Sequence, residues 1–523
     1  MAKINVMNSK TTTQKVLNFS SIFFLFAIVF SSCKKNKTDT IVTLPPPVIT
    51  VEKPNVVFYG LTDNNQLIKY NSRTAETPNA PISINGLQVS EKIMSIDFRP
   101  ATGQLYGLGS SSRLYQINLN TGNATGIGAT SFLPVLNGTI ASIDFNPTVD
   151  RVRLVTNQGQ NLRLHPETGM VAATDLNING ILNPTITSIA YTNSIAGATT
   201  TDLFDIDFTS KKLYKQLPPN EGSLVEVGTL NINFTGKAGF DITPDNSVAL
   251  GTFVIDGTTK LYSINATDAN TTFLSNIAAP IIDIAIPTNE VAYAISEAGM
   301  FQIFNPTSPS NHINKSITGL LAGESILGID FRPMNGQLYG LASTTSGAAR
   351  MITFNLATGA VSPVGVGFSI TNNTTAIGFD FNPTVDRIRV VTNQGQNLRL
   401  NPMDGTIAGT DAMLNPGTPL VNGAAYTNNF AGSTATTLFV LDATKLYIQS
   451  PPNAGTLMPV GNLGFIADSQ NGFDIGGRTN NAFAIFGVGG INKLYTINTT
   501  TGAATSVVDY PNKVVAMAVG LGF

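Results

Sequence analysis

A short phrase with an aspartate between apolar residues recurs along this chain. It reads SIDFRP from Ser95, SIDFNP from Ser142 and GIDFRP from Gly328. Several carboxylates placed around one axis would suit calcium or another hard cation. Alternatively, each carboxylate accepts backbone N–H groups and joins neighbouring units, and repetition favours this interpretation because a binding site seldom needs every unit. The candidate residues are Asp97, Asp144, Asp241, Asp330, Asp380 and Asp474.

A second candidate is a polar stretch that the chain contains twice, NPTVDRVRLVTNQGQNLRLHP from Asn146 and NPTVDRIRVVTNQGQNLRLNP from Asn382. Its arginines are Arg151, Arg153 and Arg163, then Arg387, Arg389 and Arg399. Mid-strand arginines on strands packed on both faces need acidic partners. Such partners are at hand in Asp144, Asp150 and Glu167, then Asp380, Asp386 and Asp404. We favour structural arginine–carboxylate staples between repeat units, with a site for an anion or acidic sugar as the alternative.

Two polar connections are candidates for a binding face. They read YTNSIAGATTTD from Tyr191 and YTNNFAGSTATT from Tyr426. Loops on one face commonly carry function, and Tyr191, Asn193, Tyr426 and Asn428 could stack on sugars and hydrogen-bond to them. Solvated turns are the alternative, and the absence of tryptophan weakens the sugar interpretation because tryptophan stacks most strongly.

The sequence supports enzyme chemistry poorly. There are two histidines, His165 and His312, and Asn401 replaces the first in the second copy. A histidine-based triad or a His-rich metal site therefore cannot be assembled. Neither a Gly-rich phosphate loop nor a GxSxG elbow stands out. Paired carboxylates of a polysaccharide hydrolase or lyase remain an alternative, but the sequence nominates no catalytic residue.

Composition narrows the class of protein. The chain has 523 residues, 30 Lys and Arg against 32 Asp and Glu, and 12% charged residues, so it offers no electrostatic footprint for nucleic acid. It combines 48 Gly and 28 Pro with 42% hydrophobic residues. Such a mixture is typical of many short strands joined by turns.

The single cysteine, Cys33, follows a segment typical of secretory signals. An apolar run from Ile22 to Phe30 is too short for a stable membrane span. The box FSSC resembles that of bacterial lipoprotein signals, although Phe30 replaces the usual leucine. The resemblance implies that Cys33 becomes the lipidated N-terminus; an ordinary cleaved signal is the alternative. We predict a signal peptide over 1–32 and a Pro-containing tether over 33–54.

The elements that position these residues recur about every 47 residues. In the first copy of the polar stretch, strands are expected over 141–145, 151–157, 161–165 and 170–174, with turns between them. Val152 and Leu154 alternate with Arg153, as half-buried strands require. Four short antiparallel strands per unit, repeated about ten times, are typical of β-propeller blades. A β-helix would have shorter coils and serial sandwiches would have longer repeats.

Three longer motifs carry a family resemblance: IDFRPATGQLYGL, FNPTVDRIRVVTNQGQNLRLNP and AAYTNNFAG. They resemble an uncharacterised bacterial family of secreted proteins, known as a domain of unknown function and placed with the β-propellers. The resemblance covers nearly all of residues 55–523 as two tandem copies. It implies the fold and export, and no catalytic residue follows from it because the family has no agreed activity.

Ring closure admits two solutions. In the first, two five-bladed halves occupy 55–288 and 289–523. The segment 281–286 then pairs with 56–61, and the segment 514–519 pairs with 291–296. In the second, DIAIPTNEVAYAI forms a tight hairpin, and one ten-bladed ring is closed by the C-terminus. We favour two five-bladed rings.

Together these observations predict an exported, lipid-anchored protein of the cell envelope, at the outer membrane or cell surface. We expect a non-catalytic recognition module for a glycan, a peptide or another envelope protein, attached to the membrane through its N-terminal lipid. A carboxylate-dependent hydrolase or lyase and a purely structural surface protein are the alternatives. No cofactor is expected unless the aspartates bind calcium, and no nucleic acid partner is expected.

Overall fold

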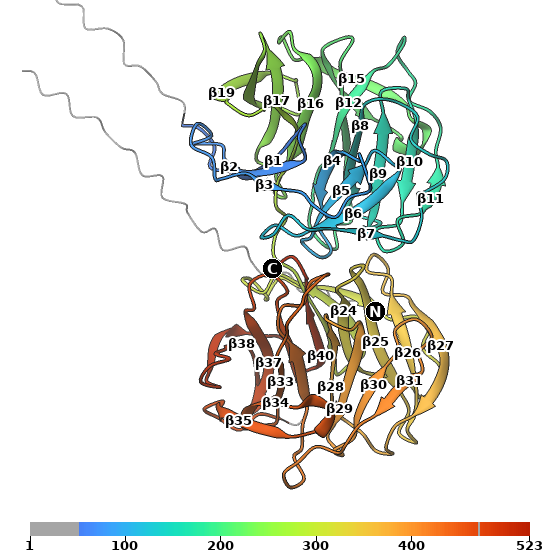
Figure 1. Cartoon of the computed structure of the whole chain (residues 1–523), viewed down its shortest axis with the longest axis vertical. Helices are drawn as coiled ribbons and strands as arrows, with labels where there is room; N and C mark the ends of the chain where they lie inside the picture. The colour runs from blue at the N-terminus through green and yellow to red at the C-terminus, as the bar shows by residue number, and fades with distance from the viewer. Residues whose placement is uncertain (1–51, 469–470) are drawn as a thin grey trace, which may run out of the picture. The chain divides into compact units, whose positions relative to one another are not determined.

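The computed structural model describes residues 52–468 and 471–523. Over these ranges the chain forms ten four-stranded antiparallel sheets (Figure 1). No helix in the described part is long and apolar enough to cross a membrane. The predicted signal peptide (1–32), the lipidated Cys33 and nearly all of the tether (33–54) lie outside the described residues. The prediction of an all-β chain of about ten four-stranded units is confirmed.

The first five sheets form ring 1, and each sheet is a blade. From inner to outer strand, the blades are β20 (Ile281–Ala285), β1 (Val57–Thr62), β2 (Gln66–Asn71) and β3 (Ile82–Ser83); β4 (Ile93–Phe98), β5 (Leu105–Gly109), β6 (Arg113–Ile117) and β7 (Ala124–Ile127); β8 (Ala141–Asn146), β9 (Arg151–Thr156), β10 (Asn161–Leu164) and β11 (Val171–Thr174); β12 (Ile186–Tyr191), β13 (Leu203–Asp207), β14 (Lys212–Gln216) and β15 (Leu224–Thr229); and β16 (Thr235–Ile242), β17 (Ala249–Ile255), β18 (Thr258–Ile264) and β19 (Thr271–Ile277).

The second five sheets form ring 2. Its blades are β40 (Val514–Val519), β21 (Ala292–Ser296), β22 (Met300–Phe304) and β23 (Ile313–Ser316); β24 (Ser325–Arg332), β25 (Gln337–Ser343), β26 (Ala348–Phe354) and β27 (Val361–Ser369); β28 (Ile377–Asn382), β29 (Arg387–Thr392), β30 (Asn397–Leu400) and β31 (Ile407–Thr410); β32 (Gly423–Tyr426), β33 (Leu438–Leu441), β34 (Lys445–Gln449) and β35 (Leu457–Asn462); and β36 (Gly472–Ile475), β37 (Ala482–Val488), β38 (Ile491–Ile497) and β39 (Ala504–Asp509). Short 3-10 turns, η1 (Pro219–Glu221) and η2 (Pro452–Ala454), precede β15 and β35.

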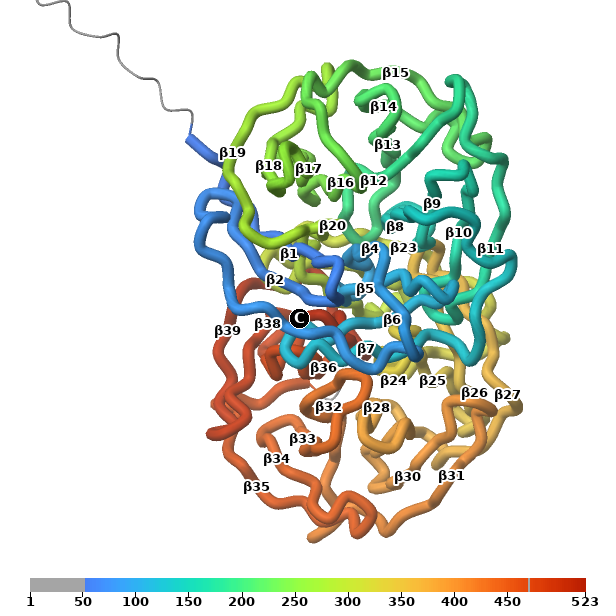
Figure 2. Tube along the Cα trace, turned by 45° about the horizontal axis from the view of Figure 1, so that its top comes forward, coloured from blue at the N-terminus to red at the C-terminus, as the bar shows by residue number. Residues whose placement is uncertain are grey.

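Each ring is closed by the last strand of its own copy. β20 lies beside β1 (Figure 2) and pairs with it antiparallel. In this pairing Tyr59 lies opposite Ala285. β40 pairs in the same way with β21, and Tyr293 lies opposite Ala518. The inner strands then contact one another in the closed orders β20–β4–β8–β12–β16 and β40–β24–β28–β32–β36. The prediction of two five-bladed rings is confirmed, and the alternative of one ten-bladed ring is wrong.

The core consists of apolar layers between neighbouring blades. In ring 1, Tyr106 of β5 packs against Phe145 of β8, with ring centroids 5.0 Å apart in an edge-on arrangement. In ring 2, Tyr339 and Phe381 repeat this contact at 5.3 Å. Because the apolar residues of each inner strand enter these layers, the residue between them must point the other way, toward the ring axis.

Candidate functional site

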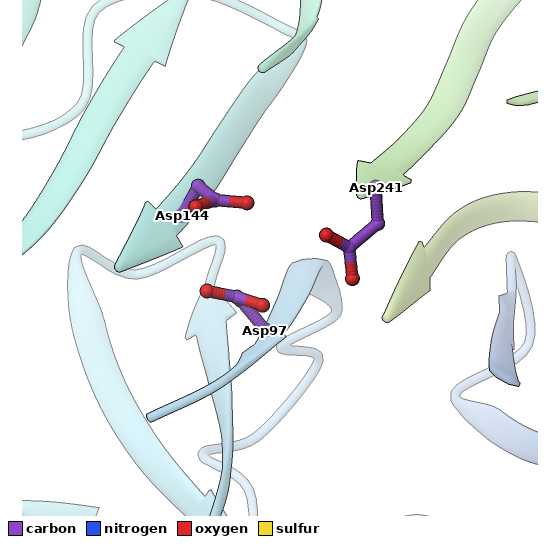
Figure 3. Close-up of side chains that lie close together, drawn as sticks. All are labelled: Asp97, Asp144 and Asp241. Carbon is purple, nitrogen blue, oxygen red and sulfur yellow. The ribbon is translucent and has the colours of Figure 1, made fainter. Parts of the chain in front are cut away.

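The recurring aspartates meet on the axes of the two rings, and these two groups of three are called the axial triads. In ring 1 the triad comprises Asp97 of β4, Asp144 of β8 and Asp241 of β16 (Figure 3). In each triad, one oxygen per carboxylate lies within 4.8 Å of the others. The triad of ring 2 comprises Asp330 of β24, Asp380 of β28 and Asp474 of β36.

Alanine makes room for the three carboxylates. At the position of the aspartate, the other two inner strands of ring 1 carry Ala190 and Ala285, and those of ring 2 carry Ala425 and Ala518. All four alanines are buried. A five-stranded ring with aspartate on three strands and alanine on two therefore accommodates a group of carboxylates that five larger side chains would crowd.

The triad carboxylates also hold neighbouring blades together in ring 1. Asp97 accepts the N–H of Phe98 in its own strand and the N–H of Phe145 in the next blade, both at 2.7 Å. Asp144 accepts the N–H of Tyr191 at 3.0 Å. Asp241 accepts the N–H of Ile286, just beyond the closing strand β20, at 2.5 Å.

Ring 2 repeats this pattern. Asp330 accepts the N–H of Phe381 at 2.7 Å, and Asp380 accepts that of Tyr426 at 2.9 Å. Asp474 accepts the N–H of Val519, in the closing strand β40, at 2.6 Å. The carboxylates thus join neighbouring blades, as the structural interpretation of the sequence requires. They also converge on the axis, as a cation site requires. The two interpretations are geometrically compatible.

Three ionised carboxyl groups buried close together cost free energy unless another charge compensates them. Burial raises the pKa of all six carboxyl groups, because a low-dielectric interior disfavours the ionised form. Repulsion from a second carboxylate adds to the rise at Asp97 and Asp380. Backbone hydrogen bonds oppose the effect of burial at Asp241 and Asp474, and the pKa of each rises to about 7. Three ionised groups this close require a proton or a cation between them.

Ring 1 contains a fourth buried carboxylate, but it has its own cation. Asp283 of β20 accepts a hydrogen bond of 2.5 Å from the hydroxyl of Ser95 and lies 3.6 Å from the ammonium nitrogen of Lys237, whose side chain is 10% exposed. In ring 2, Gly328 and Ala516 replace Ser95 and Asp283. The extra acid of ring 1 is therefore compensated by an extra base, and each triad is left with three carboxylates that have no basic partner among the described residues.

A buried amide borders the triad of ring 2. Asn429 is 1% exposed, and its side chain lies near enough to Asp330 to lower the pKa of that carboxyl group. Its Oδ1 is buried and has no hydrogen-bond partner in the described part of the chain. An amide oxygen is a ligand that calcium accepts. The sequence analysis missed Asn429, although it lies in the TNNFAG loop that follows the aspartate-lacking strand β32.

The arginines of the duplicated stretch form networks between blades. Arg153 donates to Asp175 at 2.5 Å and reaches Asn220 of the next blade at 2.7 Å. Arg163 binds the same Asp175 through two bonds of 2.8 Å. In ring 2, Asp411 takes the place of Asp175 and accepts bonds from both Arg389 and Arg399. The shared partners are thus Asp175 and Asp411 rather than the acids proposed from the sequence.

Four of the six proposed staples do not reach a neighbouring blade. Arg163 and Arg399 bind acids that directly follow the outer strands of their own blades. Arg151 and Arg387 donate to the carbonyl oxygens of the preceding residues, Asp150 and Asp386, each at 2.8 Å. Each of these arginines is the first residue of its strand, so its side chain caps the turn that precedes the strand. The carboxylate of Asp150 is instead bound by fully buried Arg99, at 2.5 Å.

Sequence reasoning missed Arg99, which also binds Glu167. The recurring phrase IDFRP could have indicated it, because an arginine follows the aspartate there. In ring 2 the same phrase contains Arg332, which pairs with Asp386 at 2.5 Å.

The proposed loop-face residues are structural. Tyr191 and Tyr426 are fully buried, so they cannot stack on a sugar at the surface. Asn193 and Asn246 exchange two hydrogen bonds of 2.7 and 2.6 Å, which tie the loop to the next blade. Asn428 and Asn480 do the same in ring 2. The expectation of tyrosine stacking was wrong, because each tyrosine is the last residue of an inner strand.

This architecture defines a class of protein, a tandem pair of five-bladed β-propellers with carboxylates on each axis. Residues 66–285 and 300–519 each match a family described as a domain of unknown function (DUF4394). The protein belongs to that family and contains two copies of its domain, as the resemblance in the sequence predicted.

Among the solved structures that are similar to this chain are two with low sequence identity. One is PorZ, described as an essential surface component of the type-IX secretion system of Porphyromonas gingivalis, with 14% identity over 86% of this chain and 66% of PorZ, and a TM-score of 0.25. The other is a putative 6-phosphogluconolactonase from Bacteroides fragilis, with 11% identity over 61% of this chain and 93% of that protein, and a TM-score of 0.27. At these TM-scores neither carries an argument about function. No curated protein matches this chain.

The pKa shifts predict how stability depends on pH in the presence of a chelator. A carboxyl group whose pKa is higher in the folded state than the usual 3.9 stabilises the fold at low pH, and this contribution is lost as the pH rises through the folded pKa. For Asp241 and Asp474 that loss extends to about pH 7. The melting temperature should fall between pH 5 and pH 8.

The matched variants for this measurement are Asp241→Asn and Asp474→Asn, in which an uncharged amide replaces the carboxyl group. Each should show a shallower fall than the parent chain when melting is followed by circular dichroism. A melting temperature that stays constant between pH 5 and pH 8 in the parent chain would contradict this account of the triads.

The shared acids of the arginine networks predict a second effect. Asp411→Asn removes the carboxylate that pairs with Arg389, which is 3% exposed and has no other ion-pair partner in the part of the chain that the structure describes. An uncompensated buried charge should cost about 3–5 kcal/mol of unfolding free energy, measured by urea denaturation. Asp404→Asn is the control in the same blade, because Asp404 binds only its own turn at Thr406, and it should change little. Equal effects of the two variants would argue against the network.

Proposed function

We propose that this chain is a non-catalytic binding module of the cell envelope, and that each of its two rings binds one divalent cation, calcium in the first instance, at its axial triad. The observation that carries the proposal is the geometry of the triads. Calcium binds oxygen at about 2.3–2.6 Å, so oxygens on opposite sides of the ion lie about 5 Å apart. The triad oxygens all lie within 4.8 Å of one another, so they are close enough together to bind one such ion.

The same residues supply the charge that such an ion needs. Each triad offers three buried carboxylates that have no basic partner within residues 52–468 and 471–523. This is true of ring 1 as well, because Lys237 compensates only the additional Asp283. In ring 2 the unpartnered Oδ1 of Asn429 is a further oxygen at the edge of the site. Ionised carboxylates that are costly alone become favourable ligands once a cation is bound.

A bound ion would also stabilise ring closure. β16 is separated from β8 by β12 and from β4 by β20, so the triad joins inner strands that do not all touch one another. A cation held by Asp97, Asp144 and Asp241 would connect three of the five blades across the axis. The same argument applies to β24, β28 and β36.

The burial of the triad carboxylates argues against a carboxylate-dependent hydrolase. The triad residues are at most 6% exposed, and every one of them accepts at least one backbone N–H. A hydrolase or lyase must bring a glycosidic bond between two carboxyl groups, and these carboxyl groups face each other. The triads therefore suit an ion and leave no space for a sugar.

The envelope location rests on the N-terminal sequence. The apolar run before Cys33 and the Pro-containing segment after it support a lipid anchor and a tether. A module held in this way at the outer membrane or cell surface would present its rings to glycans, peptides or other envelope proteins.

Calcium should raise the melting temperature of the full chain above its value in chelator. At one hundred times the dissociation constant the gain is about 2.7 kcal/mol per site. Asp144→Asn and Asp380→Asn, one in each ring, should each remove part of the shift and lower the calcium content measured by mass spectrometry. Asp63→Asn, which changes an exposed aspartate, should not. If calcium changes neither the melting temperature nor the metal content of the parent chain, the cation proposal fails.

Cys33→Ala should move the protein from the membrane fraction to the soluble fraction of a bacterial host. A thiol at this position is what a lipid anchor requires, and mass spectrometry of the mature N-terminus of the parent chain should show acylation there. Ser32→Ala is the matched control and should remain in the membrane fraction. An unmodified Cys33, with both variants distributed alike, would contradict the anchor.

A further inference from the structure

An arginine-lined cleft opens between two blades of ring 2. It has a volume of about 490 Å³ and is lined by residues that include Arg387, Arg389, Arg399, Pro451, Pro452 and Asn453. The arginines come from β29 and β30, whereas the prolines and the asparagine precede β35 in the next blade. A volume of this size lies within the range of about 300–1,000 Å³ that small-ligand pockets occupy.

The cleft carries more positive than negative charge. Arg389 and Arg399 share one carboxylate, that of Asp411. Arg387 donates to the backbone carbonyl of Asp386, whose carboxylate is bound by Arg332. Within the described ranges no acid lies within ion-pair distance of Arg387. Three guanidinium groups therefore face a single carboxylate.

Donors on these arginines remain available. Arg399 uses Nε and Nη2 for Asp411, which leaves Nη1, and its side chain is 36% exposed. Arg387 uses Nη1, which leaves Nε and Nη2. Asn453 accepts a bond from Arg389 through Oδ1, which leaves its amide N–H groups. A planar guanidinium fork matches the geometry of a carboxylate or another oxyanion.

Ring 1 carries the same arginines in a different charge environment. Glu167 stands where ring 2 has Met403, which is 70% exposed. Burial raises the pKa of Glu167, and the positive charges of Arg99 and Arg151 oppose that rise, so Glu167 lies within electrostatic reach of the first arginine of its stretch. Ring 2 keeps the arginines without an acid at this position, and the acid at the next position, Asp404, accepts hydrogen bonds from Thr406.

We propose that the arginine cleft of ring 2 binds an oxyanion group, carboxylate or sulfate, of an acidic polysaccharide. This inference deepens the proposed binding module and names its ligand class. The anion pairs with Arg387 and Arg399. Pro451, Pro452 and half-exposed Val385 offer apolar edges to a sugar ring, and Asn453 offers N–H groups to its hydroxyls.

The test measures binding of the full chain by titration calorimetry at a fixed calcium concentration. The probes are a short uronic-acid oligosaccharide, a sulfated dextran and neutral dextran. The parent chain should bind one or both anionic probes and not the neutral one. Arg387→Ala and Met403→Glu should each weaken that binding at least tenfold, the first by removing a donor and the second by restoring the acid of ring 1.

Arg151→Ala, at the corresponding position of ring 1, is the matched control and should leave the affinity unchanged. Equal losses in Arg151→Ala and Arg387→Ala would overturn the proposal, as would an absence of binding to either anionic probe. Equal affinity for single-stranded DNA would overturn it too, because it would indicate attraction to any polyanion. The calcium-induced shift in melting temperature should be the same in Arg387→Ala, and this readout separates failure of the cleft from failure of the calcium proposal.

Discussion

Both rings depend on the pairing between the end and the beginning of the same copy. Without β20, the inner edge of β1 would present unpaired N–H and C=O groups to the axis, and open edges of this kind are unfavourable in isolated sheets. The closing strand also completes the axial site. Asp241 accepts its blade-joining hydrogen bond from Ile286, and Asp474 accepts one from Val519. Closure of each ring thus also positions one carboxylate of its triad.

The triads are an expensive way to join blades if joining is all they do. Hydroxyl groups fill that role elsewhere on the same axis, where Ser95 accepts the N–H of Ile143 at 2.9 Å and Ser142 accepts that of Ile189 at 3.1 Å. A serine carries no charge to desolvate. That both copies place aspartate on the same three strands and alanine on the other two favours a role for the charge itself, and this is the basis of the cation proposal.

The two copies share the axial triads and differ elsewhere, on the blades and at Asp283. Asp205 of ring 1 is buried with neither oxygen bonded among the described residues, and burial raises its pKa well above the usual value. Val440 occupies this position in ring 2, which shows that an apolar residue is accommodated there. Likewise, the acidic Glu167 of ring 1 corresponds to the uncharged Met403 of ring 2, at the margin of the arginine cleft. The second of these differences changes the charge beside the duplicated arginines while leaving the axial triads unchanged, so two rings of one fold can present different charges to a ligand.

The sequence by itself determined the blade count, the strand positions within the duplicated stretch and the family, because alternation of apolar residues and glycine- or asparagine-bearing turns are local properties of the chain. It also singled out the six aspartates, since each stands between two apolar neighbours. Only the tertiary structure decided that they meet in threes, that Arg153 shares Asp175 with Arg163, and that Tyr191 is buried. These facts depend on which blades become neighbours after the ring closes, and contacts between residues far apart in the chain leave no periodic signal in the sequence.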